Sequence, residues 1–181
     1  ELLTSSIQNI LNENNLDISG LSAVSVGIGP GSFTGLRIGF SVAKGLCYPH
    51  NTDLIGISSL KIIANSVVKE NKNIISLIKD KGEHYYISKY GNDLKEIVKP
   101  KIKLIDRDYI FNILDDDSVI VVNTDESNEF ISDLVKEEIQ VFKRTISSID
   151  MISLSHKSLE EKKFEDVAYI EPMYVKKPYV S

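Results

Sequence analysis

The sequence predicts an α/β fold in which helices and strands alternate along the chain. Apolar residues recur at helical spacing in the opening segment ELLTSSIQNIL, and a short apolar run, Ala23–Ile28, follows a Ser-Gly turn. Beyond residue 70, apolar runs of strand length alternate with helical patterns. These observations together favour helices packed against sheets.

The first seventy residues predict a helix, a strand, a helix, a strand and a helix. Pro49 ends the second of these helices, and Ser58 is placed to cap the third. The expected ranges, in chain order, are 2–14, 23–28, 34–48, 54–57 and 58–69.

After Asn71 the pattern changes to paired strands around an Asp-Lys-Gly turn, followed by shorter helices and an extended, proline-containing tail. The expected ranges are strands 74–79, 84–90 and 94–99, helix 109–114, strand 119–123, helix 128–136, strand 140–142, helix 149–163 and tail 168–180. We expect three regions: a first subdomain at 1–70, a second at 71–145, and a C-terminal helix and tail at 146–181.

Composition narrows the class of protein. The chain has 181 residues, 42% hydrophobic and 26% charged, with a net charge of −5 that argues against a surface built to hold nucleic acid. The single cysteine, Cys47, excludes a disulfide framework and fits a reducing, cytoplasmic compartment. No apolar run approaches the roughly 20 residues that span a bilayer, so no membrane association is expected.

The stretch Val24–Ala43, VSVGIGPGSFTGLRIGFSVA, resembles a phosphate-binding loop at first sight. It lacks the lysine of a P-loop, and its glycine spacing is one residue too long for the dinucleotide fingerprint. Two interpretations remain: a sharp strand-to-helix turn, or a turn whose free amides also hold an anion. The residues concerned are Gly29, Gly31, Ser32 and Thr34, and either Ser32 or Thr34 can cap the following helix.

Small residues recur every four positions on that helix, at Gly35, Gly39 and Ala43, with Leu36 and Phe40 beside them. A glycine inside a helix costs about 1 kcal/mol relative to alanine, so two on one stripe require a compensating contact. Close approach of another helix supplies one. That helix can be the chain's own first helix or a partner's.

The segment from Val24 to Ala64 closely resembles the TsaB family, also called YeaZ. The residues that carry the resemblance are GPGSFTGLRIG at 29–39 and GISSL at 56–60. The tail Glu171-Pro172-Met173-Tyr174-Val175 is similar to the family's P-x-Y-[LV] ending. The opening helix resembles the family segment that follows its first strands, so about forty residues are expected to precede it, judged from the family layout.

The resemblance implies an actin-like, sugar-kinase-like fold of two ribonuclease-H-like subdomains. It implies a non-catalytic role in making threonylcarbamoyladenosine at position 37 of bacterial tRNA, in which the protein binds and stabilises TsaD. A TsaE-like ATPase joins the assembly, ATP and Mg²⁺ belong to the partner subunits, and the isolated protein forms homodimers. The family's pairing surface corresponds here to Gly35, Leu36, Gly39, Phe40 and Ala43, with tRNA met only through the complex.

The residues themselves also predict no catalytic set and no metal site. His50, His84 and His156 lie far apart in sequence, and the cluster Asp115-Asp116-Asp117 precedes a strand as turns do. Two alternatives stay open: an enzyme acting alone, either an ATP-binding phosphotransferase or a peptidase, and a homodimeric structural protein unconnected with tRNA.

Overall fold

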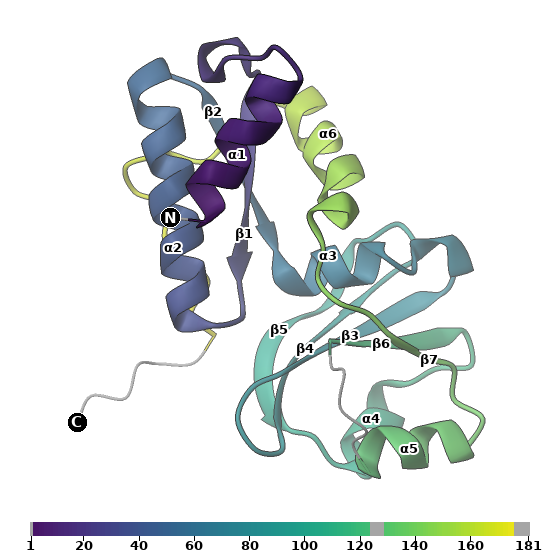
Figure 1. Ribbon diagram of the computed structural model, residues 1–181. Coiled ribbons are helices and arrows are strands. Elements are labelled where there is room, and N and C mark those ends of the chain that lie inside the picture. Colours follow the sequence, from purple (N-terminus) through teal and green to yellow (C-terminus); the bar gives the residue numbers. More distant parts are fainter. Residues whose placement is uncertain (1, 124–128, 176–181) are drawn as a thin grey trace.

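The computed structural model describes residues 2–123 and 129–175, and it shows two β-sheets flanked by helices (Figure 1). The smaller sheet lies in the first third of the chain, and the larger one lies between residues 73 and 143. The predicted α/β class is therefore confirmed. The predicted boundaries at residues 70 and 145 stay predictions.

The smaller sheet contains two parallel strands, β1 (Ala23–Gly29) and β2 (Asp53–Ser58), with Val24 opposite Leu54. The helix α2 (Phe33–Cys47) connects them, as a parallel crossover requires. Its inner side packs on the sheet through a cluster of apolar side chains. The buried members are Val26, Phe40, Ala43, Cys47 and Leu54.

The larger sheet has the strand order β5-β4-β3-β6-β7. The β3–β4 and β4–β5 pairs are antiparallel, whereas β3–β6 and β6–β7 are parallel. The strand bounds are β3 Asn73–Lys79, β4 His84–Tyr90, β5 Glu96–Leu104, β6 Ser118–Asn123 and β7 Val141–Lys143.

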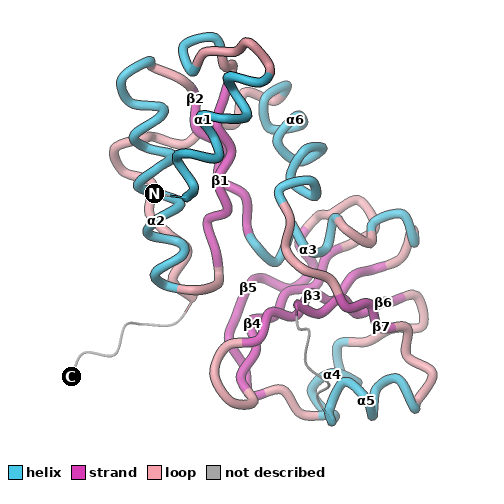
Figure 2. The backbone as a smooth tube through the Cα atoms, viewed as in Figure 1, coloured by secondary structure: helices cyan, strands magenta, loops and turns pink. Residues whose placement is uncertain are grey.

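The central strands β3, β4 and β6 are buried on both faces, which explains their nearly continuous apolar runs. One face packs against α3 (Ser59–Asn65), and the other packs against α4 (Arg107–Ile113) and α5 (Glu129–Lys136). Because α3 also lies against β1 and β2, it joins the two sheets. Figure 2 shows α3 between them.

The C-terminal region returns to the smaller sheet. The helix α6 (Ile152–Glu160) packs its Leu154 side chain against Ile55 and Ile57 of β2. Beyond it, the Glu165 amide donates to the Leu54 carbonyl (2.8 Å), and the Met173 amide donates to the Ile28 carbonyl (2.7 Å). Residues 165–174, which we call the C-terminal strap, are thus fixed to both strands.

The first helix, α1 (Leu2–Glu13), follows its predicted range but is thinly packed. Only Leu11 is buried, whereas Leu2, Leu3 and Ile10 remain exposed. Short 3₁₀ turns complete the chain, and within the described residues no helix is long and apolar enough to cross a membrane. These turns are Ile18–Gly20, Tyr48–His50, Val68–Glu70 and Ser148–Met151.

Several predicted boundaries differ from the structure. The strand β5 continues through Pro100 to Leu104, because an edge strand tolerates a proline that offers no amide. The helix α3 ends at Asn65 rather than near residue 69, and α6 occupies 152–160 rather than 149–163. Residue 128 of the predicted helix and residues 176–180 of the predicted tail lie outside the described residues.

Candidate functional site

The glycine turn at the end of β1 is built around Gly29. Its φ of +101° lies in the region that favours glycine. A Cβ added there would lie 3.0 Å from Leu36 Cδ1 and 3.3 Å from the Met173 carbonyl oxygen. Gly31 differs, because nothing lies within 4 Å of its added Cβ. Both conformation and space therefore require glycine at position 29.

Ser32 caps α2. Its Oγ accepts a hydrogen bond from the Gly35 amide (3.3 Å), and its carbonyl accepts one from the Leu36 amide (2.9 Å). Of the two residues that the sequence left open as caps, the structure selects Ser32, while Thr34 lies exposed in the first turn. An anion held by the turn at Gly29, Gly31, Ser32 and Thr34 stays a prediction.

The small-residue stripe of α2 faces the chain's own sheet over most of its length. A Cβ added at Gly39 would lie 3.8 Å from Val26 Cγ2, and Phe40 and Ala43 are each only 5% exposed. The expectation that Phe40 and Ala43 contact a partner is therefore wrong, because both belong to this chain's core. Gly35 is exposed and Leu36 is half-buried. The small residues let α2 lie close to β1, not to a second helix.

The outward side of α2 carries apolar side chains that the prediction missed. Ile38 is 53% exposed and Tyr48, directly after the helix, is 76% exposed. Leu3 and Ile10 of α1 are exposed as well, and we refer to these four exposed apolar side chains together as the outer face of α1 and α2. Several exposed apolar side chains on neighbouring segments are typical of interaction sites rather than of ordinary solvent-facing helices.

An aromatic and cationic cluster lies where α2 begins. The Phe33 and Tyr174 rings have centroids 5.8 Å apart, and the Arg37 guanidinium carbon lies 4.0 Å from the Phe33 centroid. Arg37 follows Phe33 by four residues and therefore shares its side of the helix. We call Phe33, Arg37 and Tyr174 the turn cluster. It joins the glycine turn to the C-terminal strap, two segments that carried the sequence resemblance.

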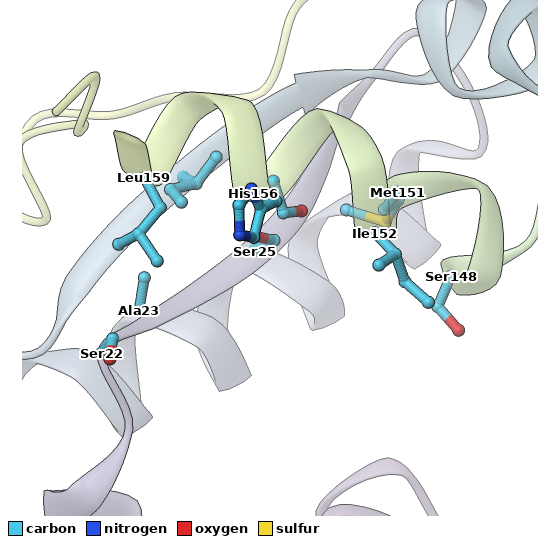
Figure 3. Close-up of a pocket in the computed structure, with 10 residues that line it drawn as sticks. Ser22, Ala23, Ser25, Ser148, Met151, Ile152, His156 and Leu159 are labelled. Carbon is cyan, nitrogen blue, oxygen red and sulfur yellow. The ribbon is translucent and has the colours of Figure 1, made fainter. Parts of the chain in front are cut away.

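A cavity of about 410 Å³ lies between β1 and α6 (Figure 3). The residues that line it include Ser25 of β1, Ile55 of β2, and Ile152 and His156 of α6. His156 Nδ1 lies 3.5 Å from Glu160 Oε1, and within the described ranges no serine hydroxyl is hydrogen-bonded to His156. The residues that line the cavity thus combine one imidazole with hydroxyl and apolar groups, and the described contact of that imidazole is with Glu160.

The single cysteine of the chain, Cys47, does not have the environment of an activated thiol. Burial, with the Asp53 carboxylate, raises the pKa of the Cys47 thiol, and that thiol is fully buried under α2. His50, His84 and His156 lie in three separate elements. In the part of the chain that the structure describes, no group of three or more His, Cys, Asp or Glu side chains is arranged for a metal ion.

Residues 1–109 match the family described as TsaD, tRNA N6-adenosine threonylcarbamoyltransferase. The chain is 29% identical over 107 residues to the tRNA threonylcarbamoyladenosine biosynthesis protein TsaB of Escherichia coli (53% of this chain, 46% of that protein). It is 32% identical over 107 residues to TsaB of Bacillus subtilis (58% and 46%). It is 33% identical over 96 residues to the tRNA N6-adenosine threonylcarbamoyltransferase of Anoxybacillus flavithermus (50% and 28%). The chain therefore spans less than half the length of these relatives.

The fold is shared with solved structures. YeaZ from Pseudomonas aeruginosa superposes with a TM-score of 0.76 at 18% identity, covering 95% of this chain and 82% of that one. A second Pseudomonas aeruginosa protein, described as similar to peptidase YEAZ, gives 0.76 at 17% identity, with 96% and 82% covered. These structures support the α/β architecture with helices flanking its sheets.

The three residues of the turn cluster were not among the predicted site residues, and they differ in whether the sequence contains a signal that could have identified them. Phe33 and Arg37 are four residues apart in a predicted helix, and a search for exposed i, i+4 pairs would have found them. Tyr174 lies in the tail that resembles the family's P-x-Y-[LV] ending, but nothing local predicts its contact with Phe33, because that contact depends on the path of the strap.

Proposed function

Because the chain belongs to the family described as TsaD, tRNA N6-adenosine threonylcarbamoyltransferase, and is a homologue of the TsaB proteins, we propose that it is a binding subunit in tRNA threonylcarbamoyladenosine biosynthesis. In this proposal the chain pairs with a TsaD-like transferase, stabilises it and does not itself catalyse the transfer. The actin-like arrangement of two ribonuclease-H-like subdomains belongs to the same proposal.

One observation carries the binding role: the outer face of α1 and α2 leaves large apolar side chains in water. Ile10 and Ile38 are 59% and 53% exposed, and Leu3 is 44% exposed. Burying a large aliphatic side chain contributes about 1.5–3 kcal/mol, so covering several at once favours association. Gly35 lies on the exposed part of α2, as the predicted interface requires.

The remaining parts of the proposal concern the assembly. A TsaE-like ATPase joins the pair, ATP and Mg²⁺ bind to the partner subunits, and tRNA reaches this chain only through the complex in the cytoplasm. Without its partner the chain pairs with a second copy. The net charge of −5 supports indirect contact with tRNA, because phosphate binding relies on lysine and arginine.

A complementation experiment tests the biosynthetic role. A bacterial strain depleted of its own TsaB is supplied with this chain, and threonylcarbamoyladenosine in bulk tRNA is measured by mass spectrometry. We expect the modified nucleoside to return toward its normal level. Continued absence of the nucleoside, with folded protein accumulating in the cells, would contradict the proposal.

Calorimetry addresses the alternative of an enzyme acting alone. The purified chain is titrated with Mg-ATP, and phosphate release is followed without any partner. We expect no turnover by the chain alone. Tight binding of Mg-ATP with turnover would contradict the proposed binding subunit and would indicate a phosphotransferase instead.

A further inference from the structure

Three buried hydroxyl groups at the junction of the two sheets have no hydrogen-bond partner among the described residues. They are Ser58 Oγ at the end of β2, Ser76 Oγ of β3 and Tyr90 Oη of β4, and we call them the junction hydroxyls. Ser76 and Tyr90 are both 0% exposed. The large majority of buried polar side-chain atoms in folded proteins have a partner, so three unpaired hydroxyls in one region require an explanation.

The junction hydroxyls share one face of the larger sheet, beneath α3. Ile74 of β3 and Tyr90 of β4 belong to the apolar cluster that packs against α3. Because side chains alternate along a strand, Ser76 lies on the same face as Ile74, and Ser88 is opposite Ser76 in the register of β3 and β4. Ser58 directly precedes α3, which contacts both sheets. The junction hydroxyls therefore come from both sheets.

The surroundings of the Tyr90 phenol show which groups lie nearest to it. Burial raises the pKa of Tyr90, whereas the neighbouring Ser88 and Ser58 hydroxyls act in the opposite direction. The Ser88 hydroxyl is already engaged, because it donates to the Val98 carbonyl (2.6 Å). Ser58 occupies the N-cap position of α3, but its side chain makes no capping hydrogen bond. The Ser58 and Tyr90 hydroxyls are thus neighbours that do not form an ordinary hydrogen bond with each other.

Neighbouring polar groups that do not bond directly are typical positions for a bridging water. A hydroxyl donates one hydrogen bond and accepts up to two, and a buried water makes about three bonds to groups that otherwise lack partners. The junction hydroxyls are neutral and include no carboxylate, so their chemistry suits water rather than a divalent cation. Three unpaired hydroxyls on one buried face match the bonding capacity of internal water.

We propose that ordered internal water is the partner of the junction hydroxyls. One water bonds to Tyr90 Oη and Ser58 Oγ, and it reaches Ser76 Oγ directly or through a second water. Because Ser58 belongs to the smaller sheet and the other two residues belong to the larger one, this water links the two sheets beside α3. The inference concerns the junction of the sheets and does not depend on the proposed function.

A high-resolution crystal structure of the chain tests the site directly. We expect an ordered water about 2.5–3.0 Å from both Tyr90 Oη and Ser58 Oγ, the normal range for bonds between oxygen atoms. A direct hydrogen bond between the two hydroxyls would overturn the proposal. So would hydroxyls with no water within hydrogen-bond distance.

The substitution Tyr90→Phe tests the same site in solution, because the two possibilities predict changes of opposite sign. If water partners the phenol, removing the hydroxyl leaves buried groups short of a bond, and the melting temperature should fall by at least about 2 °C. If the phenol is unpaired, phenylalanine removes a buried polar group that has no partner, and the melting temperature should not fall. An unchanged or higher melting temperature would therefore refute the water.

The matched control is Tyr109→Phe. Tyr109 Oη is also buried without a partner, but Tyr109 packs with α4 on the opposite face of the larger sheet, where the described residues include no second unpaired hydroxyl. We expect Tyr109→Phe to leave the melting temperature unchanged or to raise it. An equal fall for both variants would indicate a general effect of losing a phenol hydroxyl and would count against the proposed site.

A double-mutant cycle shows whether Ser58 and Tyr90 share the water. Ser58→Ala should lower the melting temperature although the helix loses no cap, since this side chain does not cap α3. The double variant Ser58→Ala with Tyr90→Phe should lose less than the sum of the two single losses, because the first substitution already disturbs the shared water. Additive losses would show that the two hydroxyls act independently, contrary to the proposal.

Discussion

At the residue scale, Gly29 is the position where the turn depends most on glycine. Gly29→Ala places a side chain at a φ of +101° and 3.0 Å from Leu36 Cδ1. We expect it to lower the free energy of unfolding by about 1–3 kcal/mol. Urea denaturation followed by circular dichroism measures the change.

The neighbouring glycine provides the control. Gly31 has an open surrounding, with nothing within 4 Å of an added Cβ, so Gly31→Ala should leave stability nearly unchanged. Equal destabilisation by the two substitutions would show that the turn does not distinguish the positions, contrary to its geometry.

The carboxylate of Asp115 makes the stability of the protein depend on pH. Lys89 Nζ donates to Asp115 Oδ2 (2.6 Å), and Ser118 and Asn73 also donate to this carboxylate. These bonds, led by that from Lys89, lower the pKa of Asp115 from 3.8 to about 2. Because the folded state favours the charged form of Asp115, this carboxylate stabilises the folded protein fully above about pH 4. That contribution to the free energy of unfolding is lost as the pH falls toward 2.

The substitution Asp115→Asn tests this contribution. Lys89 would keep the Ile113 carbonyl as an acceptor but lose its carboxylate, so we expect a loss of about 1–3 kcal/mol at pH 7. The difference from wild type should shrink when melting is repeated between pH 4 and pH 2. Asp93→Asn, which breaks the exposed pair with Lys95, is the control and should have no measurable effect. A difference that stays constant down to pH 2 would refute the assignment.

At the element scale, α2 depends on its cap. Ser32→Ala removes the hydroxyl oxygen that accepts from the Gly35 amide and should destabilise the protein by about 1 kcal/mol. Thr34→Ala, two residues on, should cost much less because Thr34 is exposed and does not cap the helix. Chemical denaturation of the two variants compares them directly, and a larger loss for Thr34→Ala would be inconsistent with the cap.

Most elements could be predicted from the sequence because their patterns are local. The period of α1, the apolar runs of β3 and β6, and the break at Pro49 depend on neighbours in the chain. The stripe on α2 was recognised, but its partner was not. A run of small residues shows that something lies close, and only the fold shows that this is β1.

The path of the strap could not be predicted. Nothing near Glu165, Met173 or Tyr174 in the sequence indicates β2, β1 or Phe33, because those contacts join residues more than a hundred positions apart. The candidate site was therefore predicted in part. The helix and the turn were found, whereas the exposed Arg37 and Ile38 were not among the predicted interface residues.

At the scale of the whole molecule, the two sheets differ in burial and in the surface features that they carry. The central strands of the larger sheet are buried on both faces and supply much of the core. The smaller sheet carries α2, the glycine turn and the strap, and it is the side of the molecule on which the exposed apolar residues of α2 lie. The proposed partner binding therefore concerns the part of the molecule that contains the smaller sheet.

The central claim is that the outer face of α1 and α2 binds the transferase paralogue. Its most direct test is the dissociation constant of that complex for Ile38→Asp and for Val135→Asp, two substitutions of apolar residues that are 53% and 55% exposed on helices of different sheets. We expect Ile38→Asp to weaken binding by at least about tenfold, equivalent to about 1.4 kcal/mol, and Val135→Asp to have little effect. Equal affinity of the two variants and the wild type, or stronger weakening by Val135→Asp, would contradict it.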